Sequence, residues 1–175
     1  MEYESLQIND VSLSLFAHFE RRQQVTLCWR MRNGAWGIEE DPFTDDWSAA
    51  DYQSLVLSLR ETLRGGGLVL GAFEGGRLLG FAAVDAPLFG KELQYMDVPY
   101  LHVTATARGR GIGRALFERA KRWAGEHGAA KLYISAHSAV ESQAFYRAMG
   151  CVDAQEPDPE HVRLEPFDRQ LECKL

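Results

Sequence analysis

Glycine and arginine alternate in one short stretch of the chain, ATARGRGIGRAL, at residues 105–116. A strand-forming segment that ends at Val103 or Thr104 precedes this stretch, and a helix-forming segment follows it. The first amides of a helix have no partner within the helix and lie at the positive end of its dipole, so they attract anions. Glycines let an anion approach the backbone closely, and arginines add charge-assisted contacts. The stretch therefore predicts a strand, a diphosphate-binding turn and a helix.

Two common phosphate-binding motifs do not fit this turn. A P-loop has Gly-Lys and then Ser or Thr at the helix start, where this chain has Gly-Ile-Gly-Arg. A dinucleotide fingerprint needs GxGxxG, but its sixth residue is Arg114 when counted from Gly109 and Leu116 when counted from Gly111. A tight strand-to-helix turn with solvated arginines remains the alternative to a diphosphate site.

Turn and capping residues divide the rest of the chain. Asn33-Gly34 is a preferred two-residue hairpin turn, because both residues tolerate a positive φ. Pro99 cannot donate a backbone hydrogen bond, so we expect a strand edge, a bulge or a splayed region near it. The order of elements predicts an α/β (α+β) fold with a mixed sheet and helices on its faces. The expected elements are a strand at 5–8, a helix at 11–20 capped by Asn9 or Asp10, a hairpin at 25–40, a helix at 49–64 capped by Ser48, a hairpin at 68–84, a strand at 93–105, a helix from the glycine-rich turn to about 127, a strand at 131–136, a helix at 140–149, and strands at 151–154 and 169–175.

Composition limits the classes of function. The length of 175 residues fits one domain, expected over residues 1–175. A net charge of −6 argues against general nucleic-acid binding and suits a cationic partner, although most acidic proteins are merely soluble. The N-terminus is acidic where a signal peptide is basic, and no segment approaches the roughly 20 apolar residues of a membrane span, so we expect no membrane association and a cytoplasmic location. Three scattered cysteines predict neither a disulfide framework nor a zinc site, and no metal is expected.

The motif Arg108-Gly109-Arg110-Gly111-Ile112-Gly113 matches the Arg/Gln-x-x-Gly-x-Gly/Ala signature of the GCN5-related N-acetyltransferase (GNAT) superfamily. Residues 101–152 resemble the strand-turn-helix-strand-helix core of that superfamily, and the resemblance is weakest between residues 20 and 65. It implies the GNAT fold, with a mixed, mostly antiparallel central sheet, flanking helices and two strands that splay apart. It also implies acetyl-coenzyme A (acetyl-CoA) as the co-substrate.

The same resemblance implies where acetyl-CoA binds. The pyrophosphate would lie on the amides of the glycine-rich turn, and the pantetheine arm beside the preceding strand, in a gap between residues 101–105 and 132–136. The asparagine common in the family is Ala139 here, and Ser138 or Ser142 is the candidate replacement for its hydrogen bond. The implied cofactor-binding residues are Leu101, His102, Val103, Arg108, Gly109, Arg110, Gly111, Ile112, Gly113, Arg114, Ser138 and Ser142.

Candidate catalytic residues follow from the same comparison. Tyr146 matches the tyrosine of the family pattern Tyr-x-x-x-Gly-Phe and is implied to protonate the leaving thiolate, the alternative being an aromatic packed on the core. Cys151 replaces the Phe of that pattern, and we interpret it as a small buried apolar residue. Asp97 falls where histone-type members place a catalytic Glu, the alternative being a solvated edge carboxylate. His102, on the opposite strand face from its neighbours, and His137 are further candidate bases, for which a structural role is the alternative.

The acceptor site is expected to involve residues 20–50. Tryptophans and carboxylates gather there and favour a cationic amine, unless the tryptophans pack on the sheet beneath a solvated acidic loop. Our interpretation is an N-acetyltransferase in which a primary amine of a small molecule or peptide attacks acetyl-CoA directly in a ternary complex. The alternatives are a non-catalytic module that binds or senses acyl-CoA, and an acyltransferase for longer chains or oxygen acceptors. Monomer and homodimer both stay open, because the apolar tail at 170–175 suits pairing with a second copy or within the chain. The tryptophans and carboxylates of the expected acceptor region are Trp29, Trp36, Trp47, Glu39, Glu40, Asp41, Asp45 and Asp46.

Overall fold

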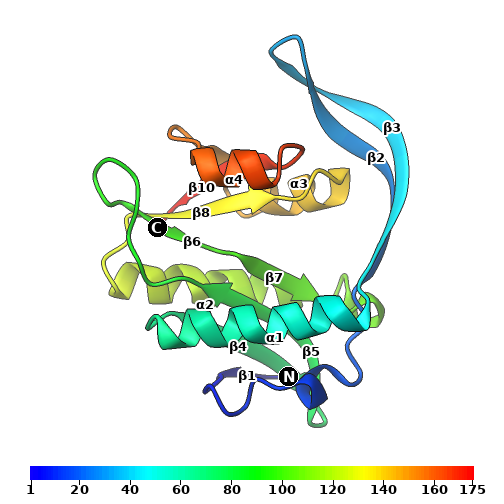
Figure 1. The fold of residues 1–175 in the computed structure, drawn as a ribbon, viewed down its shortest axis with the longest axis vertical. Coiled ribbons are helices and arrows are strands. Elements are labelled where there is room, and N and C mark those ends of the chain that lie inside the picture. Colours follow the sequence, from blue (N-terminus) through cyan, green and yellow to red (C-terminus); the bar gives the residue numbers. More distant parts are fainter.

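A computed structural model describes residues 1–175 and contains two four-stranded sheets and a long hairpin (Figure 1). The first sheet is antiparallel, with the strand order β1-β4-β5-β7. Its strands are β1 (Glu2–Ser5), β4 (Leu68–Glu74), β5 (Arg77–Val84) and β7 (Tyr100–Val103). The turn of the β4–β5 hairpin is Gly75-Gly76, and both glycines have a positive φ. The predicted hairpin at 68–84 is thus confirmed.

The second sheet has the order β6-β8-β10-β9, with one parallel pair, β6 and β8. Its strands are β6 (Tyr95–Asp97), β8 (Lys131–Ala136), β9 (Val152–Asp153) and β10 (Arg169–Lys174). β10 lies between β8 and β9, so the tail pairs within its own chain. The predicted mixed, mostly antiparallel sheet is confirmed.

The two sheets separate at Pro99. The single strand expected at 93–105 is two strands, because β6 pairs with β8 and β7 pairs with β5. The last hydrogen bond on the β8 side comes from the amide of Val98 to the carbonyl of Tyr133, and the following residue, Pro99, has no amide hydrogen to continue the ladder. β7 and β8 therefore diverge, which confirms the predicted splayed strands.

Two helices cover opposite faces of the first sheet (Figure 1). α1 (Ala49–Arg64) begins with a capping box between Ser48 and Asp51 and packs against β4 and β5 with the turn η1 (Leu13–Phe16). α2 (Ile112–Glu126) packs on the other face, in a cluster that extends to β8 and β10. The remaining helical elements are η2 (Ala105–Ala107), α3 (Val140–Ala148) and α4 (Pro159–Leu164). No helix has the length and apolar character that crossing a membrane requires.

The hairpin of β2 (Arg22–Arg32) and β3 (Ala35–Asp46) extends away from the two sheets in Figure 1. Its turn is the predicted Asn33-Gly34, with φ values of 52° and 81°. The hairpin contacts the rest of the chain at the end of β8, where the amide of Trp29 donates to the carbonyl of Ser138 at 2.8 Å. The segment in which the family resemblance is weakest, residues 20–65, thus contains this strand pair, which contacts the C-terminal half of the chain, and the helix α1.

Two predicted elements are wrong, and one element was not predicted. The first strand is at 2–5 and not 5–8, because residues 7–10 form a turn in which Asp10 accepts the amide of Gln7 at 2.7 Å. The helix expected at 11–20 is a single 3-10 turn, where Phe16 and Phe19 both pack on Phe81. The short helix α4 has no counterpart among the predictions.

Candidate active site

The glycine-rich turn leaves its backbone amides without partners in the protein. α2 begins at Ile112, and its N-cap is Gly111. Gly109 and Gly111 have φ values of 76° and 79°, a conformation that costs a residue with a side chain about 1–2 kcal/mol. None of the amides of residues 108–114 donates a hydrogen bond to another group of the chain. The positive end of the α2 dipole therefore presents a run of free N–H groups.

The side chains of this turn differ in their surroundings. Arg110 pairs with Glu74 of the β4–β5 turn at 2.7 Å, and exposed pairs of this kind contribute little to stability. Arg108 donates through Nε to the carbonyl of Val103 at 3.3 Å, whereas Arg114 makes no hydrogen bond or ion pair. Ile112 is buried in the core beneath the turn. Positive charge thus stays at the surface of the turn, next to its free amides.

β7 offers an unpaired backbone edge to the divergence between the sheets. It pairs with β5 on one side only and ends the order of its sheet. Leu101 and Val103 pack against the α2 core, while His102 points to the other face, as strand alternation predicts. The second edge of β7 carries no strand and is the edge to which an extended ligand could add hydrogen bonds.

Tyr146 lies on α3 with its ring against α2 and its hydroxyl unpaired. The ring packs edge-on against Phe117 and Phe145, at centroid distances of 5.9 and 5.1 Å. Burial raises the pKa of the phenol above its usual value, so the hydroxyl keeps its proton at neutral pH. The ring is therefore packed on the core, as in the alternative prediction. The hydroxyl also keeps its proton and donates it to no other group of the chain.

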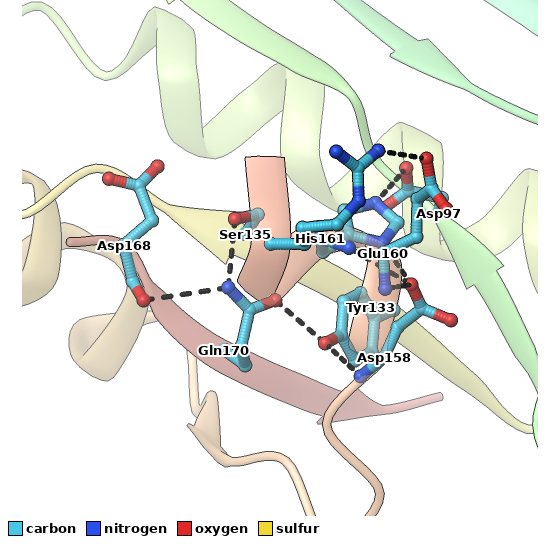
Figure 2. Close-up of polar contacts among 9 residues, drawn as sticks. Asp97, Tyr133, Ser135, Asp158, Glu160, His161, Asp168 and Gln170 are labelled. Carbon is cyan, nitrogen blue, oxygen red and sulfur yellow. Dashed lines mark hydrogen bonds and ion pairs between the residues drawn. The ribbon is translucent and has the colours of Figure 1, made fainter. Parts of the chain in front are cut away.

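Asp97 ends β6 at the point where the sheets separate (Figure 2). Its Oδ2 lies 3.0 Å from Nε2 of His161 on α4, whereas its Oδ1 is buried without a partner. Burial raises the pKa of this carboxyl, and His161 opposes that shift. Asp97 is therefore a buried carboxylate, and the alternative of a solvated edge carboxylate is wrong.

The two candidate histidines are hydrogen-bonded neighbours of the hairpin. Nδ1 of His102 accepts from Nε of Arg21 at 3.1 Å, and burial holds the pKa of His102 well below its usual value. Nδ1 of His137 accepts the amide of Ala139 at 3.2 Å, and its Nε2 lies 3.8 Å from Asp45. Each imidazole thus uses its Nδ1 to accept a hydrogen bond from another group of the chain.

The segment around Ala139 packs against the hairpin. Ala139 is fully buried against Val25 and Cys28 of β2. Neither the Ser138 nor the Ser142 hydroxyl makes a hydrogen bond. The buried amide that does connect these elements belongs to a residue that sequence reasoning missed: Gln143 donates to the carbonyls of residues 136 and 137, at 2.9 and 3.0 Å.

The negative charge of residues 20–50 is largely compensated within the hairpin. Two of its tryptophans, Trp29 and Trp36, stack on the guanidinium of Arg169 at 5.2 and 5.1 Å. The hairpin thus attracts a cation less strongly than its composition predicts. Its ion pairs are Arg21–Asp45, Arg22–Asp46, Arg30–Asp41 and Arg32–Glu39.

The C-terminal segment supplies acidic groups that the sequence analysis did not consider. Asp168 is half-buried and makes no ion pair, and burial together with the nearby Glu165 raises its pKa to about 7. It acts electrostatically on Tyr146, as Asp97 does. His161 is a further missed residue. The Asp158-Pro159 start of α4 is a helix-start signal that could have located its helix.

Metal-ligating side chains, cysteines and surface hollows are further features that can form a site. No three His, Cys, Asp or Glu side chains are placed to share a metal ion, and the three cysteines are free and buried. A surface hollow of about 430 Å³ lies between η1 and α1, away from the turn and the strand divergence. It is lined by Ser12, Leu13, Gln53, Val56, Leu57 and Arg60.

Comparison with known proteins assigns this arrangement to a family. The family model described as "Acetyltransferase (GNAT) family" matches residues 29–151, more than half of the chain. The chain belongs to the GNAT acetyltransferase family. The predicted membership is thereby confirmed, and the chain matches no curated protein sequence.

Solved structures share the fold of this GNAT acetyltransferase. A nourseothricin acetyltransferase has a TM-score of 0.68 at 18% identity, with 98% of this chain and 95% of that chain covered. A Bacillus anthracis structure described as a streptothricin acetyltransferase in complex with acetyl-CoA has a TM-score of 0.74 at 16% identity, with 99% of each chain covered. The PaiA N-acetyltransferase from Thermoplasma acidophilum, in complex with CoA, has a TM-score of 0.59 at 16% identity, with both chains fully covered. At these identities the likeness concerns the fold.

Proposed function

We propose that this GNAT acetyltransferase transfers the acetyl group of acetyl-CoA to a primary amine by direct attack in a ternary complex. The observation that carries the proposal is the run of unpartnered amides at 108–114, which lies at the start of α2 and directly after β7. Charge-assisted contacts from three exposed arginines would supplement these amides. The residues proposed for the diphosphate are Arg108, Gly109, Arg110, Gly111, Ile112, Gly113 and Arg114.

The pantetheine arm is proposed to lie along the free edge of β7. Its amide groups would pair with the backbone of Leu101, His102 and Val103, in the way a strand is added to a sheet edge. Leu101 and Val103 pack their partly buried side chains against the core, and this contact holds their backbone in position. Ser138 and Ser142 flank the other side of the divergence and remain candidate contacts.

The chemical step needs one proton donor and one proton acceptor. The amine nitrogen forms a bond to the thioester carbon, the carbon–sulfur bond breaks, and Tyr146 gives its proton to the departing thiolate. Asp97 takes the proton that the acceptor's ammonium must lose before its lone pair is available. No covalent intermediate is needed, because the thioester is already activated and the cysteines are buried.

The acceptor is proposed to be a cationic amine. Asp97 and Asp168 are carboxyl groups without an arginine or lysine partner, and they favour a positively charged ligand over an acidic one. The names of solved neighbours do not single out one acceptor, since they include acetyltransferases for nourseothricin and for the alanine of a ribosomal protein. Both a small amine and a peptide therefore belong in the test.

The experiment is thiol release from acetyl-CoA by the purified protein. The acceptor panel comprises polyamines, aminoglycosides, streptothricin-type antibiotics, amino acids, and peptides with a free N-terminal alanine or a lysine. Release that depends on an amine, with the acetylated product identified by mass spectrometry, is the expected result. CoA binding without release for any amine would contradict the proposal and favour the sensing module.

A further inference from the structure

The short helix α4 brings a histidine onto the buried carboxylate at the strand divergence (Figure 2). His161 bridges two carboxylates, with Nε2 at 3.0 Å from Oδ2 of Asp97 and Nδ1 at 2.9 Å from Oδ1 of Asp158. Asp97 and His161 are 64 residues apart in sequence. No other side chain donates a hydrogen bond to Asp97, and its Oδ1 is buried. The imidazole is therefore the one side chain that holds this carboxylate in place.

The imidazole itself is fixed from three sides. Asp158 is the N-cap of α4 and accepts the amides of Glu160 and His161, both at 3.0 Å. The hydroxyl of Tyr133 on β8 accepts the amide of Asp158 at 2.7 Å, and the Tyr133 ring lies 5.2 Å from the imidazole. The Phe89 ring is nearly parallel to the imidazole, with its centroid 6.4 Å away. His161 is thus positioned by the backbone of its own helix and by the sheet beneath it.

We infer that His161 is a positioning residue for acceptor deprotonation, which orients Asp97 and keeps it ionised so that Asp97 Oδ1 can take the proton of the acceptor's ammonium. This inference rests on the proposed function. His161 itself touches neither the acceptor nor the thioester in this account. It acts through the hydrogen bond that its Nε2–H donates to Oδ2 of Asp97.

The electrostatics of the group support this role. A buried carboxyl favours its neutral form, so burial raises the pKa of Asp97 and works against its role as a base, whereas the hydrogen bond from His161 lowers that pKa. The two carboxylates raise the pKa of His161 to about 9, so the imidazole is cationic at neutral pH. The other charge that acts on Asp97 is Asp85, which opposes its ionisation and whose Oδ1 accepts from Thr62. Two carboxylates and one imidazolium leave a net charge of −1, which attracts an ammonium.

The proton balance is simple. The ammonium N–H bond breaks, its proton binds Oδ1 of Asp97, and the nitrogen keeps the electron pair that attacks the thioester carbon. Asp97 becomes neutral while His161 stays cationic, and the proton leaves to solvent after the product departs. The step needs no further reactant.

The test is the pH dependence of kcat/KM in His161→Gln, with acetyl-CoA and the most active amine of the panel. Glutamine keeps a polar donor near Asp97 but removes the positive charge. We expect the acidic half-maximum of kcat/KM to move to higher pH by about one unit or more, with a rate at pH 7 at least about tenfold lower and recovery towards wild type near pH 9. Asp158→Asn, which keeps the imidazole, should shift the profile in the same direction by less. Arg163→Gln on the same helix removes only an exposed pair with Glu160 and should leave the profile unchanged.

A second measurement does not depend on activity. The ¹⁵N shifts of the His161 imidazole should titrate with a pKa near 9 in the wild type and closer to 6.5 in Asp97→Asn. A profile of His161→Gln that superimposes on the wild type, or a wild-type imidazole that titrates near 6.5, would overturn the inference. If no amine is acetylated at all, the proposed function fails, while the imidazole titration still decides whether the pairing exists.

Discussion

Tyr146 combines a packed ring with an uncommitted hydroxyl. Such a phenol can donate a proton at no cost in broken protein contacts, because its oxygen has no hydrogen bond to lose. Its raised pKa keeps the phenol protonated at neutral pH, so the proton is available when the carbon–sulfur bond breaks. The proposed protonation of the leaving thiolate depends on this one proton.

Replacing Tyr146 by Phe should reduce kcat/KM by about a hundredfold to ten-thousandfold, the usual contribution of a general acid. The ring packing against Phe117 and Phe145 is retained, so the affinity for acetyl-CoA and the thermal stability should change little. Steady-state kinetics and calorimetric titration check both statements. Tyr3→Phe on β1 serves as the matched control, and equal rates for the two variants would rule out the proton-donor role.

Asp168 predicts a pH dependence of stability. Its pKa is about 7 in the folded chain, above the ordinary value of 3.8, so the folded state binds its proton more tightly than the unfolded state does. Stability relative to an uncharged replacement is therefore lost as the pH rises from about 4 through 7. Asp168→Asn should match the wild type near pH 4 and exceed it above pH 7 by on the order of 1–3 kcal/mol, as measured by urea unfolding at both pH values. A constant difference across this range would contradict the assigned burial.

At the scale of elements, the hairpin β2–β3 depends on a small residue at the start of α3. Ala139 lies between Val25 and Cys28 without exposed surface, and the neighbouring amide of Trp29 bonds to Ser138. The loss of the family's asparagine at this position is thereby explained, because the hairpin occupies the space that a larger polar side chain would need. Alanine in place of asparagine at position 139 is therefore a feature of how this chain packs its hairpin.

Restoring that asparagine should destabilise the protein. Ala139→Asn adds an amide to a filled apolar contact, and we expect a loss of about 1–3 kcal/mol in the free energy of unfolding. Ala148→Asn at the exposed end of α3 provides the control and should change it by about 0.5 kcal/mol or less. Urea unfolding of the two variants gives the comparison. Equal stability of Ala139→Asn and wild type would show that the hairpin does not pack as described.

Elements that depend on local chemistry could be predicted from the sequence. Asn33-Gly34 requires two positive φ values, and Ser48 caps α1 through bonds within four residues, so neither depends on the remainder of the fold. The helix expected at 11–20 failed because tertiary contacts of Phe16 and Phe19 with Phe81 outweighed the apolar periodicity. α4 could also have been predicted, because Asp158-Pro159 is a local helix-start signal.

At the scale of the whole molecule, the proposed site lies where the two sheets part. The turn at 108–114 and the divergence after Pro99 follow from glycine, arginine and proline in one segment, so that half of the proposed site was predictable. The other half was not, because Asp97 and His161 meet across 64 residues of sequence and the pKa of Asp168 is raised mainly by burial, which depends on the folded chain. The family resemblance supplied Tyr146 and Asp97, but their surroundings come from the hairpin and α4 of this chain.

The most direct test of the central claim is a crystal structure of the protein with bound CoA. The account predicts phosphate oxygens about 2.7–3.2 Å from amide nitrogens of residues 108–114, with the pantetheine arm between β7 and β8. A diphosphate bound elsewhere, with these amides facing only solvent, would contradict it.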